Sequence, residues 1–323
     1  MGVPARSTNL ALLCALVLAF ATGVGAVWTG SARGAWVVIG HGLVGVTVVL
    51  LIPWKSRVVR HGMRRKRWTR WISYALAALA LAALTTGLLS GTGLAANLID
   101  RETLWWHVAI ALALVPPLLW HIFSRVVRPK RTDLSRRNLL RAGTLAGLGI
   151  AAYATTAAVV TVAGLPGARR RFTGSYEVDA ANMPNTIWLN DSTPAIDLDR
   201  WRLDAAGRMF SLADLAAMRQ ETVRATLDCT SGWFAEHDWT GVRLRDLGRP
   251  GPAHRSVVVH STTGYWVRLP IDDLDSLLLA THGHGFPLRL VAPGRRGYWW
   301  VKWVDRVELS EAPWWWQPPF PTT

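Results

Sequence analysis

Residues 9–28 read NLALLCALVLAFATGVGAVW and contain no charged side chain. A helix that spans the hydrocarbon core of a bilayer needs about 20 mostly apolar residues, and this run has that length and composition. Four further runs of the same kind follow, at residues 35–53, 71–97, 103–124 and 139–164. The sequence therefore predicts five transmembrane helices that form an α-helical bundle within the membrane lipid bilayer, all of them in the first half of the chain.

Positive charge is concentrated beside these runs. The 323 residues include 36 Lys or Arg against 21 Asp or Glu, a formal net charge of +15. Residues 55–70 contain eight basic side chains and residues 125–141 contain seven, so these two stretches account for nearly all of the net charge. Under the positive-inside rule both are cytoplasmic loops, which places the N-terminus inside and the chain after the fifth helix outside. Because aromatic side chains do not interleave with the basic ones as they do in nucleic-acid sites, we expect no nucleic acid partner.

The fifth run is preceded by Ser135 to Leu140, which read SRRNLL and resemble a twin-arginine export signal. An arginine pair beside a membrane can also be only a topology signal. Twin-arginine export carries proteins that are already folded, most often because a cofactor is inserted first. No small-x-small cleavage site precedes Leu165, so we expect the helix to stay as an anchor.

This reasoning predicts three parts and a location. Residues 1–130 form a four-helix transmembrane bundle, residues 131–168 carry the twin-arginine motif and the fifth helix, and residues 169–323 form an extracytoplasmic domain. The location expected is the plasma membrane of a prokaryote, crossed several times, with the C-terminal domain outside and the N-terminus in the cytoplasm.

The last 155 or so residues alternate between short apolar runs and turn signals, which is typical of a mixed α+β, β-rich domain. Strands are predicted at residues 257–260, 265–269 and 299–304. Short helices are predicted at residues 211–219 and 271–280, each opened by a candidate capping residue.

The chain has two cysteines, Cys14 in the first apolar run and Cys229 in the second half. On this topology they lie in different compartments and cannot form a disulfide. An unpaired thiol outside the cytoplasm is exposed to oxidation and is usually paired or absent unless it is used. Cys229 is then a buried inert residue, a nucleophile or a soft metal ligand.

Four segments around and after Cys229 resemble a known family. Residues 226–233 read TLDCTSGW, residues 239–247 read WTGVRLRDL, residues 284–293 read HGFPLRLVAP, and residues 297–304 read GYWWVKWV. In this order they are similar to the sulfite oxidase-like molybdopterin oxidoreductases. The resemblance implies a sulfite oxidase-like fold for the second half and a molybdopterin cofactor.

The resemblance also implies roles for particular residues. Cys229 would bind molybdenum through its thiolate, and the molybdopterin would be contacted by His284, Arg289 and Lys302. Asn190 is similar to an asparagine that cradles the cofactor near the start of the family domain. A surface ion pair is the alternative for Arg289 and also for Lys302.

Two departures from the family pattern bear on the substrate. The loop between Leu279 and His284 is shorter than in most relatives, and the arginines that hold sulfite in true sulfite oxidases are not identifiable. The substrate is therefore an unidentified small molecule.

Histidines within apolar runs suggest a second cofactor, because ionisable residues in a membrane are costly. His41 and His107 lie near the start of the second and fourth runs, which cross in the same direction, so both are expected near the outer face. Two imidazoles at one depth suit a b-type haem, and hydrogen bonding within the bundle is the alternative. His121 lies fourteen residues after His107, about 21 Å deeper on nearly the same helix face. It would suit a second haem, but fourteen residues after His41 stands Lys55, so one haem is expected.

The sequence as a whole predicts a membrane-bound molybdenum oxidoreductase of the oxygen-atom transfer type. Its electrons would pass through the b-type haem to or from quinone or another redox protein. The alternative is a non-catalytic membrane haem protein whose exported domain binds a partner or ligand.

Overall fold

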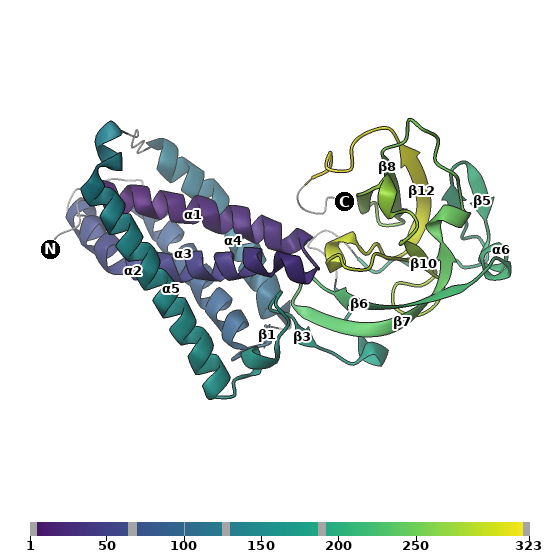
Figure 1. The fold of residues 1–323 in the computed structure, drawn as a ribbon, viewed down its shortest axis with the longest axis horizontal. Helices are drawn as coiled ribbons and strands as arrows, with labels where there is room; N and C mark the ends of the chain where they lie inside the picture. The colour runs from purple at the N-terminus through teal and green to yellow at the C-terminus, as the bar shows by residue number, and fades with distance from the viewer. Residues whose placement is uncertain (1–4, 64–69, 100, 125–129, 187–191, 319–323) are drawn as a thin grey trace. The chain divides into compact units, whose positions relative to one another are not determined.

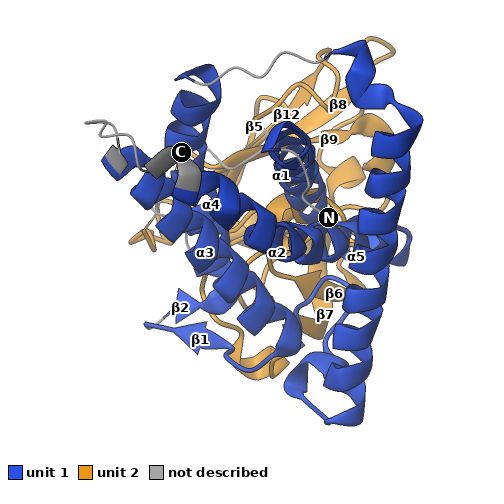
Figure 2. Cartoon of the chain, turned by 90° about the vertical axis from the view of Figure 1, so that its left-hand side faces the viewer, with its two compact units in different colours: residues 1–26, 32–176 blue, residues 27–31, 177–323 orange. Residues whose placement is uncertain are grey.

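The computed structural model describes residues 5–63, 70–99, 101–124, 130–186 and 192–318. The chain divides into two compact units, coloured separately in Figure 2. The first comprises Met1–Ala26 and Ala32–Tyr176, and the second comprises Val27–Ser31 and Glu177–Thr323. The three-part division expected from the sequence is not tested by this clustering and stays a prediction.

The first unit is helical (Figure 1). Among the described residues, five helices are long and apolar enough to cross a membrane. Their exposed surface includes many large apolar side chains, for example Leu81 at 61% and Phe123 at 73% exposure, which suits contact with lipid. These observations suggest membrane insertion. The helices are α1 (Ala5–Trp28), α2 (Ala35–Met63), α3 (Arg70–Thr92), α4 (Thr103–Ser124) and α5 (Arg136–Val162).

Several helix boundaries differ from the predicted ones, and α1 begins four residues early, at Ala5. Helix α2 continues through Pro53 to Met63, because a proline removes only one backbone donor and a long apolar helix tolerates that loss. Helix α3 ends at Thr92, since Gly93 turns to φ +73° and closes the helix by donating to Leu89 O at 3.0 Å. Helix α5 begins at Arg136, so the arginine pair lies in its first turn.

Glycines allow α2 and α5 to pack closely. A Cβ atom at Gly42 would lie 2.6 Å from Tyr153 Cε2, and one at Gly149 would lie 2.5 Å from Thr47 Oγ1. A side chain at either position would force its neighbour to shift. Small residues at helix contacts are typical of membrane bundles, where backbones approach through them. A two-stranded sheet, β1 (Asn97–Leu98) with β2 (Arg101–Glu102), connects α3 to α4.

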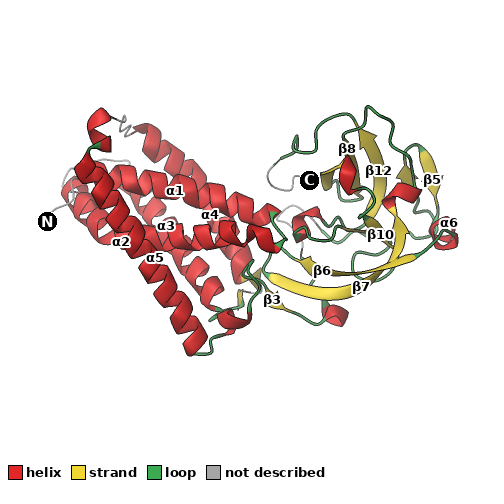
Figure 3. Cartoon of the chain, in the orientation of Figure 1, coloured by secondary structure: helices red, strands yellow, loops and turns green. Residues whose placement is uncertain are grey.

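The second unit is built mainly of strands (Figure 3). Its described part contains two five-stranded sheets. In the first sheet the order is β11-β10-β7-β3, with β6 also paired to β7; in the second it is β5-β4-β12-β8-β9. The first sheet comprises β3 (Tyr176–Glu177), β6 (Glu221–Asp228), β7 (Trp233–Arg243), β10 (Leu278–Ala280) and β11 (Arg289–Val291). The second comprises β4 (Leu203–Ala205), β5 (Arg208–Phe210), β8 (Ser256–Ser261), β9 (Trp266–Pro270) and β12 (Val304–Ser310).

Two predicted strands and one predicted helix are confirmed, with small shifts. Residues 257–260 lie in β8 and residues 266–269 in β9, which pair antiparallel with each other. Helix α6 (Leu212–Ala217) opens at Ser211, which forms a capping box with Asp214.

Two other predictions are wrong. The predicted helix at 271–280 is a short 3-10 turn, Ile271–Asp273, followed by β10, whose three residues are fully buried between β7 and β11. An apolar run that is covered on both faces suits a central strand. The predicted strand at 299–304 is instead a 3-10 turn, Gly297–Trp299, a single β-bridge at Lys302 and a bend at Trp303, which has φ +54°; the regular strand β12 begins only at Val304.

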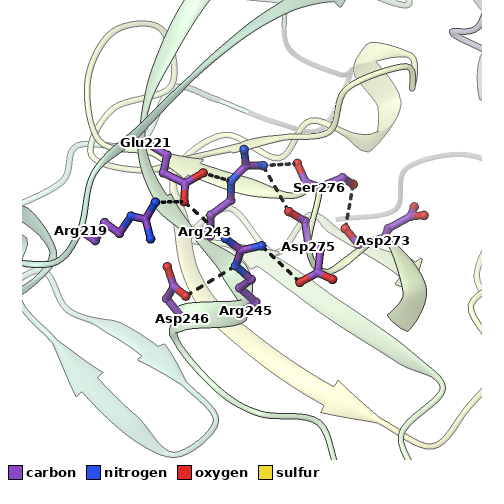
Figure 4. Close-up of polar contacts among 8 residues, drawn as sticks. All are labelled: Arg219, Glu221, Arg243, Arg245, Asp246, Asp273, Asp275 and Ser276. Carbon is purple, nitrogen blue, oxygen red and sulfur yellow. Dashed lines mark hydrogen bonds and ion pairs between the residues drawn. The ribbon is translucent and has the colours of Figure 1, made fainter.

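An ion-pair network joins β6 and β7 to the segment before β10 (Figure 4). Glu221 accepts from Arg243 Nε at 2.8 Å and from Arg245 Nη2 at 3.4 Å. Arg243 Nη1 also donates to the carbonyl of Ser276 at 2.9 Å. The hydrogen bond from Arg243 holds the pKa of the Glu221 carboxyl below its ordinary value. These contacts connect β6 and β7 to the segment that leads into β10 and so stabilise the first sheet there.

Candidate active site

Cys229 lies in the tight connection between β6 and β7. Its backbone N–H donates to Trp233 O at 2.8 Å, and its carbonyl accepts from Gly232 N at 3.1 Å. Gly232 has φ +108°, a conformation that a side chain would strain. The hairpin therefore presents Cys229 at its tip, with 9% of the residue exposed.

The sulfur of Cys229 contacts a hydroxyl. Ser231 Oγ lies 3.2 Å from Cys229 Sγ and 2.9 Å from Thr186 Oγ1. Thr186 Oγ1 in turn accepts from Trp233 Nε1 at 3.1 Å. Neither Ser231 nor Thr186 is a residue type that sequence reasoning singles out, because a buried Ser or Thr more often satisfies backbone groups.

Arg296 hydrogen-bonds to the backbone of the same hairpin. Its Nη2 donates to Cys229 O at 2.9 Å and lies 3.7 Å from Asp228 Oδ1, and both side chains are at most 3% exposed. A Cβ atom at Gly297 would lie 2.9 Å from Cys229 Cα, so only glycine fits beside the hairpin. The sequence analysis missed Arg296, since one of two adjacent arginines after a Pro-Gly turn has no distinguishing signal.

Arg289 is a buried cation beside Cys229. It is 4% exposed, and its Nη1 donates to His284 O at 3.2 Å. Its Nε is buried without a hydrogen-bond acceptor, and no carboxylate in the described part of the chain forms an ion pair with it. Burial lowers the pKa of Arg289 to about 10, an effect that the nearby Cys229 opposes. A guanidinium that is desolvated without an anion is costly, so this position is suited to an anionic ligand.

Lys302 and His284 lie at the same place. Lys302 and Arg289 form a β-bridge, and a Cβ atom at Gly285 would lie 3.2 Å from both Arg289 Nη1 and Lys302 Cγ. Lys302 Nζ donates to Asn185 Oδ1 and to Thr186 O, each at 2.6 Å. Burial, and then the charges of Arg289 and Lys302, lower the pKa of His284 to about 3, so its imidazole is neutral.

The structure thus brings Cys229 and Arg289, which are buried, together with Lys302 and His284, which are half-buried, in one region of the second unit. Trp239 and Trp300 flank the guanidinium of Arg289, with ring centroids 5.6 and 5.9 Å from its Cζ. Asn190, the remaining residue predicted to contact the cofactor, lies outside the described residues. The donors present, a thiol, a guanidinium, an ammonium and a neutral imidazole, suit a soft metal ion together with a phosphate-bearing organic group.

In the first unit His41 and His107 are close together. Their ring centroids are 5.9 Å apart, with an angle of 79° between the ring planes. His41 Nδ1 donates to Ala19 O at 3.0 Å, and His107 Nδ1 donates to Ala83 O at 2.9 Å. His121 lies fourteen residues along α4 from His107, about 21 Å away on a continuous helix, so it does not join this pair.

The two histidines rest on matching segments of the neighbouring helices. Residues 19–23 read AFATG in α1, and residues 83–87 read ALTTG in α3. In each segment the alanine carbonyl and the threonine hydroxyl contact the ring nitrogen Nδ1. A Cβ atom at the glycine of either segment would lie 3.1 to 3.3 Å from the histidine Cε1. The repeated A-x-x-T-G pattern therefore contacts both imidazoles in the same way, through Nδ1 and not through Nε2.

Comparison with known proteins identifies the second half. Residues 190–316 match the family described as the oxidoreductase molybdopterin binding domain. The chain is 28% identical over 136 residues to the uncharacterized oxidoreductase YuiH of Bacillus subtilis (strain 168), an alignment covering 36% of this chain and 68% of YuiH. It is 27% identical over 178 residues to the mitochondrial sulfite oxidase of Rattus norvegicus, covering 39% of this chain and 33% of the rat enzyme. Residues 190–316 are therefore similar to a molybdopterin-binding oxidoreductase domain, and this similarity supports an oxidoreductase.

Proposed function

We propose that this chain is a membrane-bound molybdenum oxidoreductase whose molybdopterin site is centred on Cys229. The observation that carries the proposal is the placement of a buried thiol beside Arg289, a buried guanidinium with no carboxylate partner in the described structure. A thiolate and an unpaired cation are complementary to the metal and the phosphate of this cofactor.

Each residue of the site then has a defined task. Cys229 binds the metal, and the hairpin that Arg296 supports keeps the sulfur in place. Arg289 and Lys302 bind the anionic end of the cofactor, and the neutral His284 can donate or accept one hydrogen bond to its polar ring. Asn190 is a further candidate for the same contact. When bound, the molybdenum centre supplies two-electron oxygen-atom transfer, and the protein supplies binding and orientation.

The substrate in this proposal is a small molecule that gives or accepts one oxygen atom. The rat relative is named a sulfite oxidase. The arginines expected for sulfite are not identifiable in this sequence, so the proposal goes no further than the class of reaction.

The proposal includes a b-type haem held by His41 and His107. Their Nδ1 atoms are occupied by backbone carbonyls, which leaves Nε2 of each ring as the nitrogen for iron. The ring separation of 5.9 Å is compatible with one metal ion between two imidazoles, at metal–nitrogen distances of about 2 Å. His121, about 21 Å along α4, would not share this iron. Electrons would pass through the haem to or from quinone or another redox protein.

The proposed location is the plasma membrane of a prokaryote. The five apolar helices support insertion, and the basic loops support a cytoplasmic N-terminus. The arginine pair Arg136–Arg137 opens α5 and supports export of the second unit after folding.

Metal and pterin analysis of a Cys229→Ser variant tests the proposal. The wild-type protein should contain about one molybdenum and one pterin per chain. The variant should lose oxygen-atom transfer at least 100-fold, because a hydroxyl is a poor ligand for a soft metal. Cys14→Ser is the matched control, because Cys14 lies in α1, and it should keep both cofactor and turnover. Wild-type protein without molybdenum, or undiminished turnover in Cys229→Ser, would contradict the proposal.

A further inference from the structure

The hydrogen bonds behind Cys229 form a chain that ends at its sulfur. Trp233 Nε1 lies 3.1 Å from Thr186 Oγ1, Thr186 Oγ1 lies 2.9 Å from Ser231 Oγ, and Ser231 Oγ lies 3.2 Å from Cys229 Sγ. Trp233 is 1% exposed and Ser231 is 3% exposed. The contact between Ser231 and Cys229 is therefore buried, and the two contacts of Thr186 are partly buried. Away from bulk water, hydrogen bonds polarise one another more strongly.

The chemistry of the two ends gives this chain a direction. An indole N–H only donates, so Thr186 Oγ1 must accept from Trp233. A metal-bound thiolate only accepts, so Ser231 must donate its single hydroxyl proton to Cys229. Ser231 Oγ then accepts the proton of Thr186. The order Trp233 to Thr186 to Ser231 to Cys229 uses one proton for each of these three contacts.

We infer that Ser231 is a positioning residue that donates a hydrogen bond to the Cys229 thiolate and raises the reduction potential of the metal bound there. A hydrogen bond withdraws electron density from the sulfur and so favours the more electron-rich, reduced state. Hydrogen bonds to thiolate ligands set potentials in this way at other metal centres. The inference rests on the proposed function, since it requires a metal at Cys229.

Lys302 fixes the middle of the chain. Its Nζ donates to Thr186 O and to Asn185 Oδ1, both at 2.6 Å, which orients Thr186 toward Ser231. The residue proposed to bind the cofactor therefore also holds a group that acts on the metal ligand. A loss of Lys302 would consequently affect the site in two ways, so it is a poor variant for testing Ser231.

The test is a redox titration of the molybdenum-loaded full-length protein, followed by electron paramagnetic resonance. Ser231→Ala should move the molybdenum midpoint potential to a more negative value and change the paramagnetic molybdenum signal, with molybdenum content unchanged. Thr186→Val should shift the potential in the same direction by less, because Ser231 keeps its proton but loses the donor that polarises it. Thr186→Ser retains the hydroxyl and should match the wild type.

Ser261→Ala is the matched control. Ser261 is 5% exposed, and its Oγ lies 3.1 Å from Thr263 Oγ1, so it too is a buried serine bonded to a threonine, at the end of β8. Its variant should leave the potential and the signal unchanged. A Ser231→Ala protein with full molybdenum content and a wild-type potential and signal would overturn the inference and leave the proposed function intact.

Two further outcomes are decisive. If Ser231→Ala does not fold, the pair Thr186→Val and Thr186→Ser decides, and equal potentials for those two variants would overturn the inference. Wild-type protein that contains no molybdenum would overturn the proposed function and the inference together.

Discussion

The buried charge of Arg289 should destabilise the cofactor-free protein and favour binding of an anionic cofactor. At about 1.4 kcal/mol for each pH unit, a pKa lowered from 12.5 to about 10 destabilises the folded, cofactor-free protein by about 3 kcal/mol at neutral pH. The destabilisation is present at every pH below about 10. It declines as the pH rises further, because the guanidinium then deprotonates first in the folded state. A bound anion would remove most of it.

Arg289→Met should therefore change thermal stability with opposite sign in two preparations. In protein made without the cofactor, the variant should unfold about 5 °C higher than wild type, because an unpaired buried charge has been removed. In protein made with the cofactor it should unfold lower, because cofactor binding stabilises only the folded state that can bind it. Differential scanning calorimetry of the four samples measures both shifts.

Arg243→Met supplies the control for that comparison. Arg243 is also largely buried, but it is paired with Glu221 in the network of Figure 4. Its replacement should lower the unfolding temperature in both preparations, because the partly buried Glu221 carboxylate loses its closest donor. A lower unfolding temperature for Arg289→Met in cofactor-free protein would contradict this prediction, because it would show that the charge of Arg289 is already stabilised within the protein.

At the scale of elements, the site depends on the fit between the β6–β7 hairpin and the turn Gly297–Trp299. Arg296 bonds to the hairpin carbonyl, and Gly297 abuts Cys229 Cα closely enough that a Cβ atom would lie 2.9 Å away. Two backbones meet here, so neither side can relax by rotating a side chain. The position of the sulfur is thus set by an element about 70 residues further along the chain.

Gly297→Ala should displace the hairpin and lower the molybdenum content of the purified protein several-fold. Overpacking of this kind also costs about 1–3 kcal/mol of stability. Gly251→Ala is the matched control, since a Cβ atom there would lie 3.5 Å from His254 Nδ1, an ordinary contact. Metal analysis of both variants is the measurement, and equal molybdenum in the two would show that the hairpin does not need this contact.

The whole molecule joins a helical unit that holds paired histidines to a β-rich unit that holds the proposed molybdenum site. The proposal requires electrons to pass between the two cofactor sites. The haem ligands can be tested without knowing the natural redox partner. His41 hydrogen-bonds to α1 and His107 to α3, so removal of either imidazole leaves the hydrogen bond of the other intact.

His41→Ala and His107→Ala should each abolish the b-type absorption band in a reduced-minus-oxidised spectrum. Molybdenum content should stay at the wild-type level, and turnover with a soluble artificial electron acceptor should persist. His121→Ala should retain the band, since His121 lies about 21 Å along α4 from His107. A full band in His41→Ala and in His107→Ala would refute haem ligation by this pair and leave the molybdenum proposal standing.

The local sequence pattern determined many of the helices and strands of this protein. Runs of about 20 apolar residues specify helices wherever they occur, so all five were predictable from the sequence, as were the capped helix α6 and strands β8 and β9. The motif around Cys229 also identified the cofactor family, because its residue types and their order are local information.

Tertiary structure decided what local pattern leaves open. Part of the run at 271–280 became a strand, β10, because β7 and β11 pair with its two edges and its three residues are buried, a context that its own residues do not encode. Arg296, Ser231 and Thr186 reach Cys229 only because distant segments meet at the hairpin. Hydrogen bonds and steric fit act over 3 to 4 Å, so which residues form them depends on how the chain folds back on itself and not on their spacing along it.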